Sequence, residues 1–415
     1  MLTRREWMML SGGAILSAAL PTRWASAQQA EPRVIPEYEQ PMFDIPGQIK
    51  QRVMIRSIEL LKRGSNYFVR TLSTDGAVGL SPTKQVEDFV PIFERLVAPY
   101  FRNKDARQIE TLIDDVYIAN YKMSGLALWC PVAYIEQSLL DMLGKIAKKP
   151  VGALLGGVVR KEVPVYLSGS DRVLSAEEEV AVYERGVPET GAKAVKFKIG
   201  GRMSRNVDTY PGRTETIIKR ARQKLGDQIT LYADANGSYN APKAIEIGRL
   251  LEAGNYSFFE EPCPFEELSE TIEVAKTLSI PIAAGEQDGS LWRFKWMLEN
   301  GMMKIVQPDI NYNGGLIRAL RVAGIAAKLG RTIVPHNTQT GVSSVNIVQF
   351  SSCAKNAGQY MEYPWRNSQR AETWYTPNFT IKDGKIQIPQ GPGLGIEVDP
   401  EYLKTAETVV KIGAG

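Results

Sequence analysis

From about residue 162 onward, short apolar runs alternate with longer amphipathic segments. Apolar runs of strand length followed by segments with helical periodicity are typical of parallel βα units. The runs predict strands at residues 163–167, 194–199, 229–233, 257–260, 280–284, 304–308, 332–335 and 359–362. Eight such strands in succession are typical of a (β/α) barrel.

The segments on either side of this region have a different pattern. Residues 53–61 and 67–72 are strand-like and are joined by a turn at 62–65, and residues 85–148 have helical periodicity with their most apolar stretch at 126–143. We therefore expect a small α+β domain before the barrel. Residues 28–47 are rich in proline and polar groups, which predicts an extended arm. In the tail, runs at 379–381 and 385–388 flank Asp383-Gly384, which predicts a hairpin.

Composition adds little to this picture. The chain has 415 residues, of which 44% are hydrophobic and 23% charged, which fits a soluble globular protein of two domains. A formal net charge of +4 gives no electrostatic case for a nucleic-acid partner. Cys130, Cys263 and Cys353 are too far apart and too few to predict a disulfide framework or a cysteine metal site.

The first 27 residues have the features of an export signal. Arg4-Arg5 precedes a weakly hydrophobic stretch, and Ala25-Ser26-Ala27 has the small-x-small form of a signal-peptidase site. Paired arginines indicate the twin-Arg route to the periplasm. The alternative is an uncleaved anchor, but roughly 14 apolar-leaning residues fall short of the roughly 20 that span a bilayer. We expect a leader at 1–27 and no stable membrane insertion after its cleavage.

Three carboxylates close successive predicted strands of the barrel. They are Asp234, Glu260 and Glu286. Each alone could be a surface residue or a helix cap, but three carboxylates at one barrel mouth repel one another unless a cation lies between them. Oxygen ligands with room for water and a bidentate substrate suit Mg²⁺, with Mn²⁺ as an alternative.

Lys196 and Lys198 lie on one face of the second predicted strand, because side chains alternate in a strand. A Lys-x-Lys pair alone is more often a solvated strand edge. Buried beside each other and near a metal, we expect each lysine to lower the pKa of the other, which would make one a general base.

His336 is the only histidine and follows a predicted strand, one βα unit after Asp309. The alternatives are a hydrogen-bonded core histidine and a base oriented by the Asp309 carboxylate. Glu362 ends the last predicted strand. It could be a protonated acid that binds a substrate carboxylate or an ordinary salt-bridge partner.

Taken together, the motifs resemble the enolase superfamily and, within it, the mandelate-racemase-like branch. The resemblance covers nearly the whole chain after the leader and rests on an ordered set of motifs: Leu154-Leu155-Gly156-Gly157, Lys196-Phe197-Lys198, Asp234-Ala235-Asn236, Glu260-Glu261-Pro262, Ala284-Gly285-Glu286, Gln307-Pro308-Asp309 with Gly314-Gly315, Pro335-His336, and Gly391-Pro392-Gly393-Leu394-Gly395-Ile396-Glu397.

The resemblance implies a modified (β/α)7β TIM-type barrel at 161–370, an α+β capping domain with its arm at 28–160, and a C-terminal segment at 371–415 that completes the cap. It implies Mg²⁺ ligands at Asp234, Glu260 and Glu286. The other implied roles are a base at Lys198 with Lys196 as its modulator, an Asp309–His336 dyad on the opposite face, and substrate contacts from Asn236 and Glu362.

Two departures bear on specificity. Asp309 stands where the muconate-cycloisomerase and dipeptide-epimerase branch has a lysine, which argues against both activities. The first hairpin of the cap is joined by only the few residues around Gly64, where relatives carry a specificity loop. The pocket is therefore expected to be open, or closed by the arm at 31–47 or by a neighbouring subunit of a homo-oligomer.

The resulting hypothesis is a lyase that removes the α-proton of a carboxylate substrate and dehydrates a sugar acid, with Arg202 and Arg205 in the polar stretch after the second strand binding its hydroxyls. One alternative is a racemase or epimerase of a 2-hydroxy acid. Another is an exported sugar-acid-binding protein without turnover, which would need neither Lys198 nor the dyad.

Overall fold

Eight parallel strands form the main part of the larger, nine-stranded sheet of the computed structural model, which describes residues 35–84, 86–169, 172–366 and 371–413. Their order in the sheet is β10-β9-β8-β7-β6-β5-β4-β11. All eight predicted barrel strands are found, at β4 (Glu162–Ser168), β5 (Ala194–Lys198), β6 (Thr230–Asp234), β7 (Phe258–Glu260), β8 (Ile282–Ala284), β9 (Ile305–Val306), β10 (Thr332–Ile333) and β11 (Met361–Pro364).

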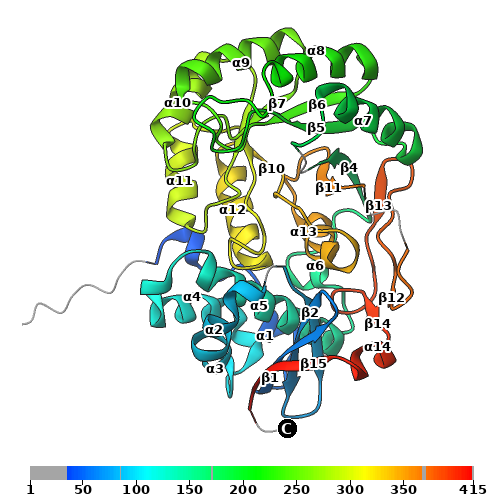
Figure 1. Cartoon of the computed structure of the whole chain (residues 1–415). Coiled ribbons are helices and arrows are strands. Elements are labelled where there is room, and N and C mark those ends of the chain that lie inside the picture. Colours follow the sequence, from blue (N-terminus) through cyan, green and yellow to red (C-terminus); the bar gives the residue numbers. More distant parts are fainter. Residues whose placement is uncertain (1–34, 85, 170–171, 367–370, 414–415) are drawn as a thin grey trace, which may run out of the picture. The chain divides into compact units, whose positions relative to one another are not determined.

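Helices connect the successive strands (Figure 1). They are α7 (Ala176–Thr190), α8 (Arg213–Leu225), α9 (Ala241–Ala253), α10 (Leu268–Thr277), α11 (Leu291–Glu299), α12 (Leu316–Lys328) and α13 (Val345–Cys353). Next to β10, Ile333 forms a single parallel bridge with Ala357, which precedes β11 in the chain. This arrangement confirms the predicted (β/α)7β barrel.

A second, antiparallel sheet forms the capping domain in the order β15-β1-β2-β3. Its strands are β15 (Glu407–Ile412), β1 (Ile55–Arg63), β2 (Asn66–Ser73) and β3 (Val78–Pro82), and β3 was missing from the sequence prediction. Arg63 pairs with Asn66, so only Gly64 and Ser65 form the turn of the first hairpin. The cap helices are α2 (Val90–Ile92), α3 (Ala98–Phe101), α4 (Ile109–Ala119), α5 (Leu126–Ala147) and α6 (Val151–Leu154).

The apolar stretch predicted at 126–143 is the start of α5, whose residues from Leu128 to Gly144 are all buried. Among the described residues, no helix is both long and apolar enough to cross a membrane. The proposed leader at 1–27 lies outside the described residues.

The arm and the tail differ from the sequence prediction. The described part of the arm is not extended throughout: it contains α1 (Ile45–Gln48), which forms because Asp44 accepts a hydrogen bond from the Gly47 N–H and Pro46 suits the first turn of a helix. In the tail, residues 379–381 form no strand. The predicted turn at Asp383-Gly384 is present, because Lys382 and Lys385 form an antiparallel bridge across it, but β13 (Lys385–Gln387) pairs with β4 of the barrel.

Asp141 of α5 joins the tail to the cap. Its carboxylate accepts hydrogen bonds from the N–H groups of Leu394, at 2.8 Å, and of Leu80 in β3, at 2.9 Å. Gly393 has a φ of +70°, and a Cβ there would lie 2.3 Å from an oxygen of Asp141. Gly393 of the tail motif is therefore required by the close approach to α5.

Glu136 of α5 caps the first turn of α12 in the barrel. Its Oε1 accepts a hydrogen bond of 2.8 Å from the Ile317 N–H, while its buried Oε2 makes no hydrogen bond. A Cβ on Gly315, whose φ is +115°, would lie 2.6 Å from the Glu136 carboxyl carbon. Burial raises the pKa of Glu136 from 4.5 to about 8.

We therefore expect the stability of the protein to depend on pH through Glu136. The unfolded chain releases this proton near pH 4.5 and the folded chain near pH 8, so the contribution is full below pH 4.5 and is lost as the pH rises towards 8. Glu136→Gln cannot ionise. The unfolding free energy of Glu136→Gln minus that of wild type should therefore increase by about 1–3 kcal/mol from pH 5 to pH 8.5. Urea titrations at the two pH values measure this difference. Parallel pH curves for the two proteins would contradict this expectation.

Candidate active site

The polar side chains predicted from the sequence converge at the carboxyl ends of the barrel strands. Strand register sets the first neighbours: Lys198 of β5 pairs with Asp234 of β6, and Asp234 pairs with Glu260 of β7. Glu286 follows β8, since Ala284 is the last residue of that strand. Parallel strands end at one edge, so these groups share one mouth.

Asp234, Glu260 and Glu286 form a buried carboxylate triad. One oxygen from each lies within 4.8 Å of the others. Glu286 Oε2 is buried and makes no hydrogen bond, so it has a lone pair to offer. Hard oxygen donors gathered in this way fit Mg²⁺. The residues present therefore suit the metal that the sequence predicts.

Two ammonium groups lie against this triad. Lys196 Nζ is 2.8 Å from Glu260 and 2.7 Å from Glu362. Lys198 Nζ forms an ion pair with Asp234 and lies 3.2 Å from the Asn236 side-chain oxygen. Both lysines thus face the carboxylates from one side of the mouth.

The electrostatics of Lys196 differ from the expected mutual lowering of the two lysine pKa values. Burial would lower the pKa of Lys196, but the charges of Glu260 and Glu362 raise it well above its ordinary value. Burial would raise the pKa of Asp234, but Lys198 and then Lys196 hold it well below its ordinary value. The two ammonium groups are counter-ions of these carboxylates.

The predicted dyad is present. His336 Nδ1 lies 2.9 Å from Asp309 Oδ2, and both residues are buried. His336 Nε2 points towards the triad, 3.4 Å from Glu286 Oε2. Burial opposes a charge on the imidazole, but Glu286 and the Asp309 hydrogen bond raise the pKa of His336. The triad therefore lies between Lys198 at the Asp234 end and His336 at the Glu286 end.

Glu362 and Asn236 complete the edge of the cluster. Glu362 Oε1 pairs with Lys196, and its Oε2 accepts a hydrogen bond of 3.0 Å from the Asn337 N–H. Burial would raise the pKa of Glu362, but Lys196 and then His336 lower it. Of the two alternatives for Glu362, this geometry favours the ionised salt-bridge partner over the protonated acid.

The structure leaves Arg202 and Arg205 exposed on the loop between β5 and α8. In the described part of the chain, no hydrogen bond or ion pair joins either guanidinium group to the triad. Arg172 is nearer: its Nη2 donates a hydrogen bond of 3.0 Å to the Asn236 side-chain oxygen. Substrate binding by Arg202 and Arg205 stays a prediction.

Sequence reasoning missed two residues that contact the site. Gln307 donates a hydrogen bond of 3.0 Å to Glu260 Oε2. Lys84 Nζ lies 2.7 Å from Asp309 Oδ2. Gln307 could have been found from its place beside Pro308-Asp309 at the end of β9. Lys84 could not, because it comes from the cap and follows β3, the strand that the pattern failed to predict.

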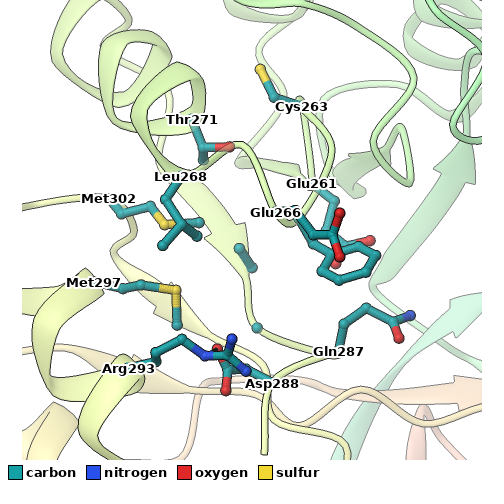
Figure 2. Close-up of a pocket in the computed structure, with 13 residues that line it drawn as sticks. Glu261, Cys263, Glu266, Leu268, Thr271, Gln287, Asp288, Arg293, Met297 and Met302 are labelled. Carbon is teal, nitrogen blue, oxygen red and sulfur yellow. Dashed lines mark ion pairs between the residues drawn. The ribbon is translucent and has the colours of Figure 1, made fainter. Parts of the chain in front are cut away.

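A cavity of about 440 Å³ adjoins the triad without including it. Figure 2 shows its apolar side chains along one flank and Asp288 with Arg293 at one end. Glu261 and Gln287, which line it, directly follow Glu260 and Glu286 in the chain. The titratable groups described above do not line this cavity themselves; only the chain neighbours of Glu260 and Glu286 do. We therefore assign the chemistry to the triad.

Comparison with known proteins agrees with this site. The family model described as enolase C-terminal domain-like matches residues 178–402, which include Lys196, Lys198, the triad, the dyad and Glu362. The chain belongs to the enolase superfamily. Within the superfamily, a mandelate racemase/muconate lactonizing protein from Paracoccus denitrificans, solved in complex with magnesium, matches with a TM-score of 0.79 at 28% identity, over 86% of this chain and 99% of that one. The chain thus lies in the mandelate-racemase-like branch.

Other members of the superfamily are equally similar. A racemase candidate from Roseobacter denitrificans has a TM-score of 0.82 at 31% identity, over 87% of this chain and 100% of its own. The D-galactonate dehydratase of Variovorax paradoxus is 31% identical over 72% of this chain and 79% of its own length. The arabinonate dehydratase of Saccharolobus solfataricus is 27% identical over 79% of this chain and 86% of its own.

Proposed function

We propose that this member of the superfamily is a lyase that dehydrates a monomeric sugar acid. Removal of the α-proton and loss of the β-hydroxyl as water leave an enol, which tautomerises to a 3-deoxy-2-oxo acid. The observation that carries the removal of the α-proton is the position of the triad between Lys198 and His336. The similarity of the chain to named arabinonate and galactonate dehydratases supports dehydration as the reaction.

The residues that would hold a divalent cation are Asp234, Glu260 and Glu286. When bound, the cation supplies positive charge opposite the substrate carboxylate, which stabilises the dianionic enediolate. Lys196, buried between Glu260 and Glu362, contributes a second positive charge at the same place. An α-proton beside a carboxylate is too weakly acidic for a lysine or histidine without such stabilisation.

Lys198 and His336 then divide the proton transfers. Lys198, in its neutral amine form, accepts the α-proton from one face of the substrate. His336, oriented by Asp309 at 2.9 Å, gives a proton to the departing hydroxyl. The opposite assignment suits the other configuration at the α-carbon, because both groups can act as base or acid.

A racemase of a 2-hydroxy acid is the second candidate. It is favoured by the presence of a base at each end of the triad and by the similarity to the Roseobacter denitrificans protein. In this case the enediolate is reprotonated from the opposite face and no hydroxyl is lost.

A screen of sugar acids with Mg²⁺ in deuterated solvent tests these candidates. We expect one or a few acids to yield a 2-oxo product, detected as its semicarbazone and by proton NMR. Lys198→Ala should lose this activity, whereas Lys193→Ala, an exposed lysine just before the same strand, should keep it. Exchange or inversion at the α-carbon without a 2-oxo product would favour the racemase, and no exchange with any acid would favour a binding protein.

We also propose export by the twin-Arg route and assembly as a homo-oligomer. The export proposal rests on Arg4-Arg5 and Ala25-Ser26-Ala27. N-terminal sequencing of periplasmic material should begin at Gln28, and an intact cytoplasmic chain as the sole product would contradict it.

The oligomer proposal rests on the two-residue turn of the first hairpin, which leaves the mouth to be closed from elsewhere. Light scattering of the purified protein tests it.

A further inference from the structure

The dyad has a third member that comes from the other domain. Lys84 follows β3 of the cap, and its ammonium lies 2.7 Å from Asp309 Oδ2 in the barrel. Its side chain is 9% exposed and that of Asp309 is 2% exposed. Among the described residues, this is the one ion pair that joins a cap side chain to the Asp309–His336 dyad.

Lys84 is held in this position by its surroundings. Its carbonyl oxygen accepts a hydrogen bond from the Tyr134 hydroxyl of α5, and its ammonium lies 4.1 Å from the centre of the Tyr312 ring. A flexible lysine side chain is costly to order. The contacts of the ammonium with Asp309 and the Tyr312 ring, together with the hydrogen bond at the carbonyl, hold Lys84 in a fixed position. The docked cap therefore delivers a charge to a defined point in the barrel.

Asp309 is bound on both of its oxygens. Oδ1 accepts hydrogen bonds from the N–H groups of Asn311, at 2.8 Å, and Tyr312, at 3.2 Å. Oδ2 receives Lys84 on one side and His336 Nδ1, at 2.9 Å, on the other. Removing one partner of a buried ion pair leaves the other charge uncompensated, and the structure around it must shift. The shared oxygen is the one that orients the imidazole.

We propose that Lys84 is a positioning residue of the reaction, which makes the orientation of His336 depend on the docked cap. This inference rests on the proposed function for its kinetic consequence. It differs from a simple domain clamp, because a clamp needs only a strong contact anywhere along the interface. Here the contact is made to the carboxylate on which the imidazole depends.

The test compares Lys84→Met and Lys84→Arg with Lys145→Met. Lys145 likewise pairs with a buried carboxylate, Asp141 at 2.6 Å, but Asp141 binds Leu80 and Leu394 and not the dyad. For Lys84→Met we expect kcat for dehydration to fall at least about 30-fold and KM to change less than about 3-fold. In Lys84→Met, exchange of the α-proton by Lys198 should change less than about 3-fold. The kcat of Lys84→Arg should be at least about 5-fold higher than that of Lys84→Met. Lys145→Met should leave all of these values near wild type.

A second readout needs no turnover. His336 is the only histidine, so one low-field proton signal of its Nδ1–H reports the hydrogen bond to Asp309. In tag-free protein we expect Lys84→Met to shift or broaden this signal, and Lys84→Arg to return it towards its original position. Lys145→Met should leave it unchanged.

Several results would overturn the proposal. A rise in KM with unchanged kcat would make Lys84 a substrate contact, and a parallel loss of exchange, turnover and thermal stability would make it a structural clamp. An unchanged imidazole signal in Lys84→Met would exclude the positioning role. Failure of the proposed function is a separate result: the wild type would then form no 2-oxo acid. If it is a racemase, the positioning role predicts that Lys84→Met loses exchange from the histidine face only.

Discussion

Glu260→Gln should lose both metal affinity and turnover. Glu260 is one of three carboxylates in the triad, and it also accepts hydrogen bonds from Lys196 and Gln307. An amide is neutral and a poorer ligand for a hard cation, and it brings N–H donors close to Lys196 and Gln307. We expect the apparent affinity for Mg²⁺ to fall at least about 10²-fold and kcat at least about 10³-fold.

Two measurements check this result. Titration calorimetry with Mg²⁺ reports the affinity, and the 2-oxo acid assay reports kcat. The matched control is Glu273→Gln, which makes the same substitution at an exposed position on α10. Wild-type turnover in an excess of chelator, or wild-type Mg²⁺ affinity in Glu260→Gln, would refute the assignment of the triad as the metal site.

His336→Asn should separate the two proton transfers. With Lys198 as the base and His336 as the acid, the enediolate still forms but its β-hydroxyl leaves without a proton donor. We expect dehydration to fall about 10³-fold, while exchange of the α-proton with deuterium is retained within about 10-fold. Proton NMR of the same reaction in deuterated solvent measures both quantities.

The complementary variant is Lys198→Met, which removes the other proton-transfer group. It should lose exchange and dehydration together. If the substrate has the other configuration at its α-carbon, the results expected for His336→Asn and Lys198→Met are reversed. A racemase gives a third pattern, in which each variant keeps exchange with one enantiomer and the wild type forms no 2-oxo acid. Wild-type turnover in both variants would disprove the placement of Lys198 and His336.

The barrel could be predicted because its pattern is local. Each strand is a short apolar run, and each is followed by a helix with start signals of its own. Ser175 before α7, for example, forms a capping box with Glu178. Most of the active site followed from the same reasoning, because residues that end parallel strands meet at one edge. That rule places Asp234, Glu260 and Glu286 together from the sequence alone.

What the sequence did not predict depends on long-range contacts. Lys84 and Asp309 are 225 positions apart and come from different domains. β13 was expected to pair within its own hairpin, but it pairs with β4, where Lys385 forms an ion pair with Glu162. The expected mutual lowering of the two lysine pKa values does not hold for Lys196, since its counter-ions, Glu260 and Glu362, come from other strands. No local pattern reports contacts of this kind.

The order of strands in the cap sheet has a consequence for biosynthesis. β15, at Glu407–Ile412, lies beside β1, at Ile55–Arg63, so one edge of that sheet is built from the far end of the polypeptide. A ribosome releases the chain from its N-terminus, and β1 must wait for nearly all of the barrel to be made before its neighbour exists. This edge of the cap sheet can therefore form only after the barrel segment has been synthesised.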